Sequence, residues 1–197
     1  RSGAANTLVR SEQGWAAYNT DVFGIVQAVR MSGDVPGDDA TILGSGATAY
    51  SAMMALQILA PSASIRVFAR NRATAKGLIQ FGKGLGLKVK ATRSFRRAIS
   101  KKRLTISTLP AGVLESYLAV KRNLPSTGIS GLLLDVAYEP WPSAAAQVWL
   151  AAGARVSSGL DMLIWQAVAQ LRIFTAGNPN EPLPNEAAVL EAMRHSV

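Results

Sequence analysis

A glycine-rich turn between an apolar run and a small-residue helix pattern is the feature that most constrains this chain. The apolar segment 40–43 leads into Gly44, Gly46 and Ala49, spaced as Gly-x-Gly-x-x-Ala. A strand, tight turn and helix in this order direct backbone N–H groups at a pyrophosphate. Gly44 permits the turn, Gly46 leaves room for a phosphate, and Ala49 lets the helix pack closely against its strand. The segment predicts a dinucleotide-binding unit.

The residues after the second expected strand indicate which dinucleotide binds. Segment 64–69 is followed by Arg70, Asn71 and Arg72, where an acidic residue would bind a free ribose 2′-hydroxyl. Arginine suits a 2′-phosphate, so the expected cofactor is NADP. Asn71 is also a typical helix cap, but Arg72 and Lys76 oppose the dipole of the helix that they begin, unless an anion binds there. The alternative is an ordinary glycine turn with solvated surface charges.

Strand and helix patterns alternate from residue 40 onward. Continuously apolar strands separated by helices predict a doubly wound parallel sheet, an α/β Rossmann-type domain. Before it, segment 5–9 predicts a strand leading into a turn at 13–14, and Thr20 or Asp21 is expected to cap a helix. We expect strands at 40–43, 64–69, 87–91, 104–107, 131–136 and 154–157, and helices at 47–60, 72–82, 94–100, 111–120, 142–152, 159–176 and 184–195.

Composition excludes some classes of protein. The chain has 197 residues, 49% of them apolar and 17% charged, which is enough to bury a core and unlike a disordered segment. It contains no cysteine, so disulfides and thiolate metal sites are excluded, and we expect no metal. No signal peptide or membrane-spanning segment is recognisable, which favours a cytoplasmic protein without membrane partners.

The net charge of +9 allows two interpretations. One is nucleic-acid binding, because cations are dense at Arg93, Arg96, Arg97 and 101–103. Only Phe95 lies among them to stack on bases, and no nucleic-acid module is recognisable. An anionic cofactor and substrate account for the charge with fewer assumptions, so we expect small-molecule ligands and no nucleic acid.

Several motifs taken together resemble the shikimate dehydrogenase family. The resemblance spans nearly the whole chain, and its motifs occur in the family's order. They are the segments Gly3–Val9, Tyr18–Gly24, Gly44–Ala49, Asn71–Arg72, Ser107–Thr108, Asp135–Pro142 and Gly159–Ala167.

The resemblance implies NADPH-dependent reduction of 3-dehydroshikimate to shikimate, in the pathway to chorismate and the aromatic amino acids, by a monomer or homodimer. It implies that Asp21 is the carboxylate of a catalytic Lys–Asp pair. Substrate-binding residues would be Asn6, Asp21, Tyr138 and Gln166. Cofactor-binding residues would be Gly44, Ser45, Gly46, Ala47, Thr48, Asn71, Arg72, Lys76, Thr108, Val136, Gly159 and Met162.

The sequence departs from the family's pattern in two places. Segment 45–48 lacks one glycine usual in the family's loop, although both turn glycines remain. The family's lysine motif, Asn-x-x-x-Pro-x-Lys, does not occur in this sequence. We therefore expect a truncated form that binds NADP(H) but turns over substrate poorly.

The expected division of the chain follows from the same resemblance. Residues 1–20 would be the end of a substrate-binding domain, 21–158 the Rossmann domain, and 159–197 helices that pack back toward the substrate domain. Two alternatives remain open, an NAD-dependent quinate/shikimate dehydrogenase and a non-catalytic NADP-binding module.

Overall fold

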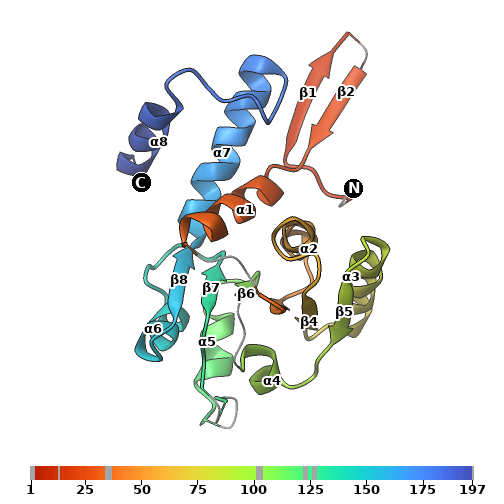
Figure 1. Ribbon diagram of the computed structural model, residues 1–197, viewed down its shortest axis with the longest axis vertical. Coiled ribbons are helices and arrows are strands. Elements are labelled where there is room, and N and C mark those ends of the chain that lie inside the picture. Colours follow the sequence, from red (N-terminus) through yellow and green to blue (C-terminus); the bar gives the residue numbers. More distant parts are fainter. Residues whose placement is uncertain are drawn as a thin grey trace.

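A six-stranded parallel sheet forms the centre of the protein (Figure 1). The computed structural model describes residues 3–12, 14–33, 37–100, 104–121, 124–125 and 128–196. The strand order β5-β4-β3-β6-β7-β8 reverses direction between β3 and β6, which creates the crevice where such sheets bind ligands. The strands are β3 (Asp39–Leu43), β4 (Ser64–Phe68), β5 (Lys88–Ala91), β6 (Leu104–Ser107), β7 (Leu132–Asp135) and β8 (Arg155–Ser158).

Helices cover both faces of this sheet, as the alternating pattern predicts. One core is formed with α1 (Asp21–Met31), α2 (Ala47–Leu59) and α3 (Arg72–Gly84). The other core is formed with α4 (Phe95–Ile99), α5 (Val113–Leu118) and α6 (Ala144–Ala151). The central strands are apolar along their whole length because both of their faces are buried. The expected doubly wound α/β fold is confirmed.

A hairpin and two helices extend beyond the sheet. Strands β1 (Thr7–Ser11) and β2 (Gly14–Tyr18) pair antiparallel, and α7 (Gly159–Ala176) leads to α8 (Glu186–His195). Figure 1 shows the hairpin, the far part of α7 and α8 together above the sheet. Strand β2 was not predicted from the sequence, because its segment has a glycine, two consecutive alanines and no β-branched residue beside its two aromatic residues. Pairing with β1 makes this segment a strand.

Close packing and one ion pair hold the extended elements in place. Gly24 of α1 lies against α7 so closely that a Cβ there would meet the Met162 carbonyl oxygen and the Gln166 side chain. At the other end of α7, Arg172 forms a salt bridge with Glu186 of α8. No residue of α8 is buried, so this salt bridge is a principal link between α8 and the rest of the protein.

The expected elements occur where the sequence predicts them, with ends shifted by at most two residues. One correction concerns the first helix. Thr20 is the N-cap residue of α1, but its side chain makes no capping hydrogen bond. The segment 101–103 of the basic cluster lies outside the described residues. Within the described part of the chain, no helix is both long and apolar enough to cross a membrane.

Candidate functional site

The turn after β3 is built against the end of β6. Gly44 has a φ of 114°, which favours glycine, and its N–H donates to the Phe68 carbonyl at 2.8 Å. The Thr108 backbone N–H and hydroxyl both donate to the Leu43 carbonyl, at 2.8 and 3.0 Å. A Cβ on Gly44 would collide with the Thr108 hydroxyl. The expected cofactor residues Gly44 and Thr108 therefore lie together at the point where the strand order reverses.

The start of α2 presents uncapped backbone N–H groups to open space. Gly46 occupies the N-cap position, and no side chain caps the helix there. Gly46 and Ala47 are exposed, and a Cβ on Gly46 would have no atom within 4 Å. A helix N-terminus with free N–H groups and partial positive charge is suited to bind a phosphate group.

The start of α3 differs, because a side chain caps it. Asn71 accepts hydrogen bonds from the N–H groups of Ala73 and Thr74, at 2.9 and 3.3 Å. Arg72 and Lys76 are exposed, and neither forms a hydrogen bond or ion pair within the described residues. Both cations are therefore free to bind an anion.

A hydroxyl pair joins the glycine turn to the start of α3. Ser45 Oγ lies 2.7 Å from Thr74 Oγ1, so this hydrogen bond holds the glycine turn and the first turn of α3 next to each other. Thr74 was not predicted from the sequence as a site residue. Its position in the first turn after the Asn71 cap was the only available signal.

The loops after β6 and β7 continue the same edge of the sheet. The Val136 N–H donates to the Ser107 carbonyl at 3.0 Å, and the Val136 carbonyl lies directly against Gly159 at the start of α7. These loops line a hollow of about 430 Å³ that contains Thr108, Val136 and Tyr138. Met162 is buried one turn into α7. The expected cofactor-binding residues are thus distributed along one continuous edge.

A polar network joins three of the four expected substrate-binding residues. Asn6 Nδ2 donates to the Asp21 carboxylate at 2.8 Å, while Asn6 Oδ1 accepts from the Thr20 backbone N–H and hydroxyl at 3.0 and 3.1 Å. The Thr20 hydroxyl is also 3.1 Å from Gln166 Oε1. Three segments therefore meet in one place: the residue before β1, the start of α1, and α7.

Burial raises the pKa of the Asp21 carboxyl, whereas the hydrogen bond from Asn6 lowers it. The first effect is the larger one. A partly desolvated carboxylate binds a hydroxyl group or a cation strongly. Asp21 is therefore suited to hold a substrate hydroxyl or to orient a lysine ammonium group.

Thr20 has a role that its position in the sequence did not indicate. Either Thr20 or Asp21 was expected to cap α1, and Thr20 does occupy the N-cap position, but its hydroxyl lies between Asn6 and Gln166. Its neighbour Asn19 donates to Ser51 of α2 at 3.0 Å, which ties the network to the helix that follows the glycine turn. A short Asn-Thr-Asp sequence gives no indication of these long-range partners.

Tyr138 is the fourth expected substrate-binding residue. Its side chain is 47% exposed, and it lines the hollow at the ends of β6 and β7. None of the hydrogen bonds described for Asn6, Asp21 or Gln166 involves it. Its expected role as a substrate-binding residue stays a prediction.

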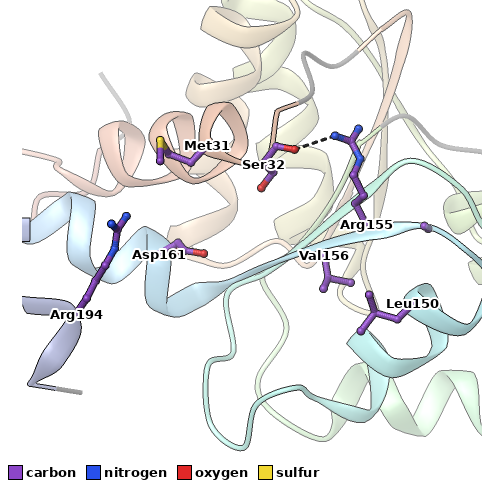
Figure 2. A pocket seen from close by; sticks show the side chains of 8 residues that line it. Met31, Ser32, Leu150, Arg155, Val156, Asp161 and Arg194 are labelled. Carbon is purple, nitrogen blue, oxygen red and sulfur yellow. Dashed lines mark hydrogen bonds between the residues drawn. The ribbon is translucent and has the colours of Figure 1, made fainter. Parts of the chain in front are cut away.

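Two other hollows lie away from the glycine turn. A groove of about 1110 Å³ runs between the hairpin, α1, α2 and α7, and its lining includes Trp15, Phe23 and Ile58. A smaller pocket of about 480 Å³ lies at the beginning of β8 (Figure 2), where Arg155 donates to the Ser32 carbonyl at 2.8 Å. Among the described residues, no group of three or more His, Asp or Glu side chains could hold a metal ion.

Comparisons with known proteins agree on one family. No protein-family model matches the sequence. The shikimate dehydrogenase (NADP(+)) of Ignicoccus hospitalis is 30% identical over 179 residues, which are 90% of this chain and 64% of that protein. The crystal structure of Mycobacterium tuberculosis shikimate dehydrogenase matches 100% of this chain and 69% of its own, with 33% identity and a TM-score of 0.80.

The crystal structure of a third relative contains bound ligands. The Thermus thermophilus shikimate 5-dehydrogenase in complex with NADP(H) and shikimate is 26% identical, with a TM-score of 0.76, and this chain covers 69% of it. The chain thus spans about two thirds of the length of these relatives, 64% in the Ignicoccus protein, and matches their carboxyl-terminal portion.

Proposed function

This chain belongs to the shikimate dehydrogenase family, and from that premise we propose that it binds NADP(H) for the reduction of 3-dehydroshikimate to shikimate. The observation that carries the proposal is the polar network of Asn6, Asp21 and Gln166, linked through Asn19 and Ser51 to α2. Residues 146 positions apart converge beside a dinucleotide-binding turn. The ligands are small molecules, and the proposal requires no nucleic acid.

The described residues fit an NADP-type cofactor. The diphosphate would lie on the uncapped N–H groups of 46–48, where no Cβ obstructs it. The 2′-phosphate would lie at the start of α3, within reach of Arg72, Lys76 and the Asn71 amide, whose Nδ2 is not used in capping. The nicotinamide end would lie in the hollow beside Thr108, Val136 and Gly159. When bound, the cofactor supplies the hydride for the ketone carbon.

The polar network would hold the substrate. The side-chain amides of Asn6 and Gln166 bind hydroxyl groups without adding charge. The Asp21 carboxylate adds one negative charge, and its oxygens accept hydrogen bonds. The ketone oxygen becomes an oxyanion during reduction and must receive a proton. In the family a lysine paired with the Asp21 position supplies it, and this sequence lacks that lysine motif. A protein of these residues alone should therefore turn over substrate slowly.

The domain boundaries also remain part of the proposal. Residues 1–20 would complete a substrate-binding domain, and 159–197 would pack against it, around the Rossmann unit 21–158. Two observations support this division. A hairpin of only two strands is marginally stable alone, and the groove beside it exposes Trp15 and Ile58, which are 70% and 55% accessible.

Cofactor preference tests the proposal. Arg72→Ala should weaken NADP(H) binding by about 1.5–3 kcal/mol, roughly 10- to 150-fold, because a charge-assisted hydrogen bond to the 2′-phosphate is lost. NAD(H) affinity should stay within about twofold, because NAD(H) has no 2′-phosphate. Calorimetric titration of both cofactors into wild-type and variant protein measures this difference.

Lys83→Ala is the matched control, since it removes one exposed positive charge from the far end of the same helix. Its NADP(H) affinity should be close to that of the wild type. An unchanged NADP/NAD ratio in Arg72→Ala would overturn the assignment of NADP and favour the NAD-dependent alternative. Tight NADP(H) binding by a full-length relative of this chain that lacks turnover would favour the non-catalytic module.

A further inference from the structure

A buried carboxylate beside the hollow has no role in the site as proposed. Asp135 is the last residue of β7 and is only 2% exposed. Its Oδ2 accepts a hydrogen bond from the Ser143 hydroxyl at 3.0 Å, and its Oδ1 accepts from the Ala137 N–H at 3.4 Å. A buried carboxylate is costly unless such donors surround it, so its presence requires a physical explanation.

These two hydrogen bonds join the opposite ends of one loop. Ala137 lies near the beginning of the β7–α6 loop, and Ser143 is the residue that starts α6. Ser143 Oγ also accepts the Ala146 N–H at 3.0 Å, so the same hydroxyl caps the helix while it donates to Asp135. The carboxylate thus links the loop at both ends to the sheet and to α6.

The loop held in this way forms one wall of the hollow. Val136, Ala137 and Tyr138 face Thr108 and the residues that follow it, across about 430 Å³. The Val136 carbonyl lies against Gly159, so a shift of the loop would also move it relative to α7. The opposite wall is independently fixed, because Thr108 bonds to Leu43. Val136 is also held by its N–H bond to the Ser107 carbonyl, so the Asp135 hydrogen bonds set the position of the part of this wall that follows Val136.

We propose that Asp135 is a positioning residue whose carboxylate fixes the 136–142 loop and keeps the hollow shaped for the nicotinamide end of the cofactor. The proposal rests on NADP(H) binding as proposed above. Asp135 acts without touching the cofactor, through the loop that it holds. The start of α3 and the glycine turn do not depend on it, so the adenosine end of the cofactor should bind independently.

A carboxylate suits this position because its two oxygens accept from two donors at once, the Ser143 hydroxyl and the Ala137 N–H. In Asp135→Asn the remaining oxygen can still accept from Ala137, and the new NH₂ group faces Ser143. The Ser143 oxygen can accept from that NH₂ group with its second lone pair, but the Ser143 hydroxyl proton then loses its buried acceptor. The loop should therefore relax away from its position.

Two ligands separate positioning from general stability. NADPH carries the nicotinamide end, whereas adenosine 2′,5′-bisphosphate carries only the adenosine and the 2′-phosphate. Asp135→Asn should weaken NADPH binding about tenfold, because a buried donor loses its partner, and should leave bisphosphate binding within about twofold. Ser143→Ala removes one of the two hydrogen bonds. It should therefore also weaken the binding of NADPH relative to that of the bisphosphate.

Glu115→Gln is the control, because it removes a carboxylate on α5 that influences the Asp135 carboxyl only through its charge. It should leave both affinities near those of the wild type. The positioning role alone would be overturned if Asp135→Asn and Ser143→Ala left the affinity for NADPH relative to that for the bisphosphate unchanged, whether both affinities fell equally or neither fell. Failure of the wild-type protein to bind either ligand would overturn this inference together with the proposed function.

Discussion

The attachment of α8 should depend on one ion pair. Arg172 donates through Nε and Nη2 to the two carboxylate oxygens of Glu186, at 2.8 and 2.6 Å, and through Nη1 to the Pro179 carbonyl at 3.0 Å. Its guanidinium carbon lies 5.1 Å from the ring centre of Phe23. The Leu183 N–H adds a further hydrogen bond to Glu186 at 3.0 Å. Hydrogen bonds thus join α7 to α8 and to the segment between them, and a cation–π contact joins Arg172 to α1.

The cost of breaking the pair can be worked out from its exposure. The two side chains are 10% and 18% accessible, so they are mostly but not fully desolvated. Removing one partner of a fully buried pair costs about 3–5 kcal/mol, and partial solvation reduces this to about 2–3 kcal/mol here. Glu186→Gln should therefore raise the equilibrium constant for local opening of α8 by roughly 30- to 150-fold.

Hydrogen exchange at the backbone amides of α8 measures this opening. The amides of the central sheet should keep their protection, because no residue of α8 belongs to the core. Glu191→Gln on the same helix is the control, since Glu191 is exposed. Equal exchange in the Glu186→Gln and Glu191→Gln variants would show that the ion pair does not hold the helix.

The same pair predicts a dependence on pH. The hydrogen bond from Arg172 lowers the pKa of the Glu186 carboxyl, with burial opposing it to a smaller extent. A carboxyl whose pKa is lower in the folded state contributes stability above its unfolded pKa and loses it as the pH falls through the folded pKa. The difference in α8 protection between wild type and Glu186→Gln should therefore shrink in acid.

Two further predictions concern the site. Gly44→Ala should lower the free energy of unfolding by at least about 2 kcal/mol, roughly 4–8 °C in Tm, because alanine is strained at a φ of 114°. Gly84→Ala is the control, since a Cβ there would enter open space on α3. Equal melting temperatures of the two variants would refute the strain at Gly44. The Asp21 carboxyl should titrate above its ordinary pKa, and Asn6→Ala should raise that pKa further by removing a donor to the charged form. Carbon-13 titration of the carboxyl checks both directions, and a lower pKa in Asn6→Ala would contradict the reasoning.

Much of the fold could be predicted from local patterns. The alternation of buried strands with helices, the Gly44–Gly46 turn and the Asn71 cap each depend on residues close in sequence. Such features follow from backbone conformation and from hydrogen bonds within a single turn, so their residue types can be recognised in the chain. Strand β2 was missed because its glycine and two alanines offset the strand preference of Trp15 and Tyr18, and only pairing with β1 defines it.

The candidate site shows where local patterns stop being informative. Thr20 fits a helix cap by its position, yet its hydroxyl lies between Asn6 and Gln166. Asp135 stands in a recognisable motif, but only its burial and its bonds to Ala137 and Ser143 suggest a role. Neither arrangement follows from residue type alone.

By itself, the sequence determined the parallel α/β architecture, the place of the dinucleotide turn and the family, because each of these depends on short-range order repeated along the chain. Tertiary structure alone decided that Gln166 meets Thr20, that Tyr138 lines one hollow with Thr108, and that Asp135 links the two ends of a loop. The physical reason is that hydrogen bonds reach only about 3 Å. A contact between residues 146 positions apart therefore exists only once the sheet and the close α1–α7 packing at Gly24 have brought them together.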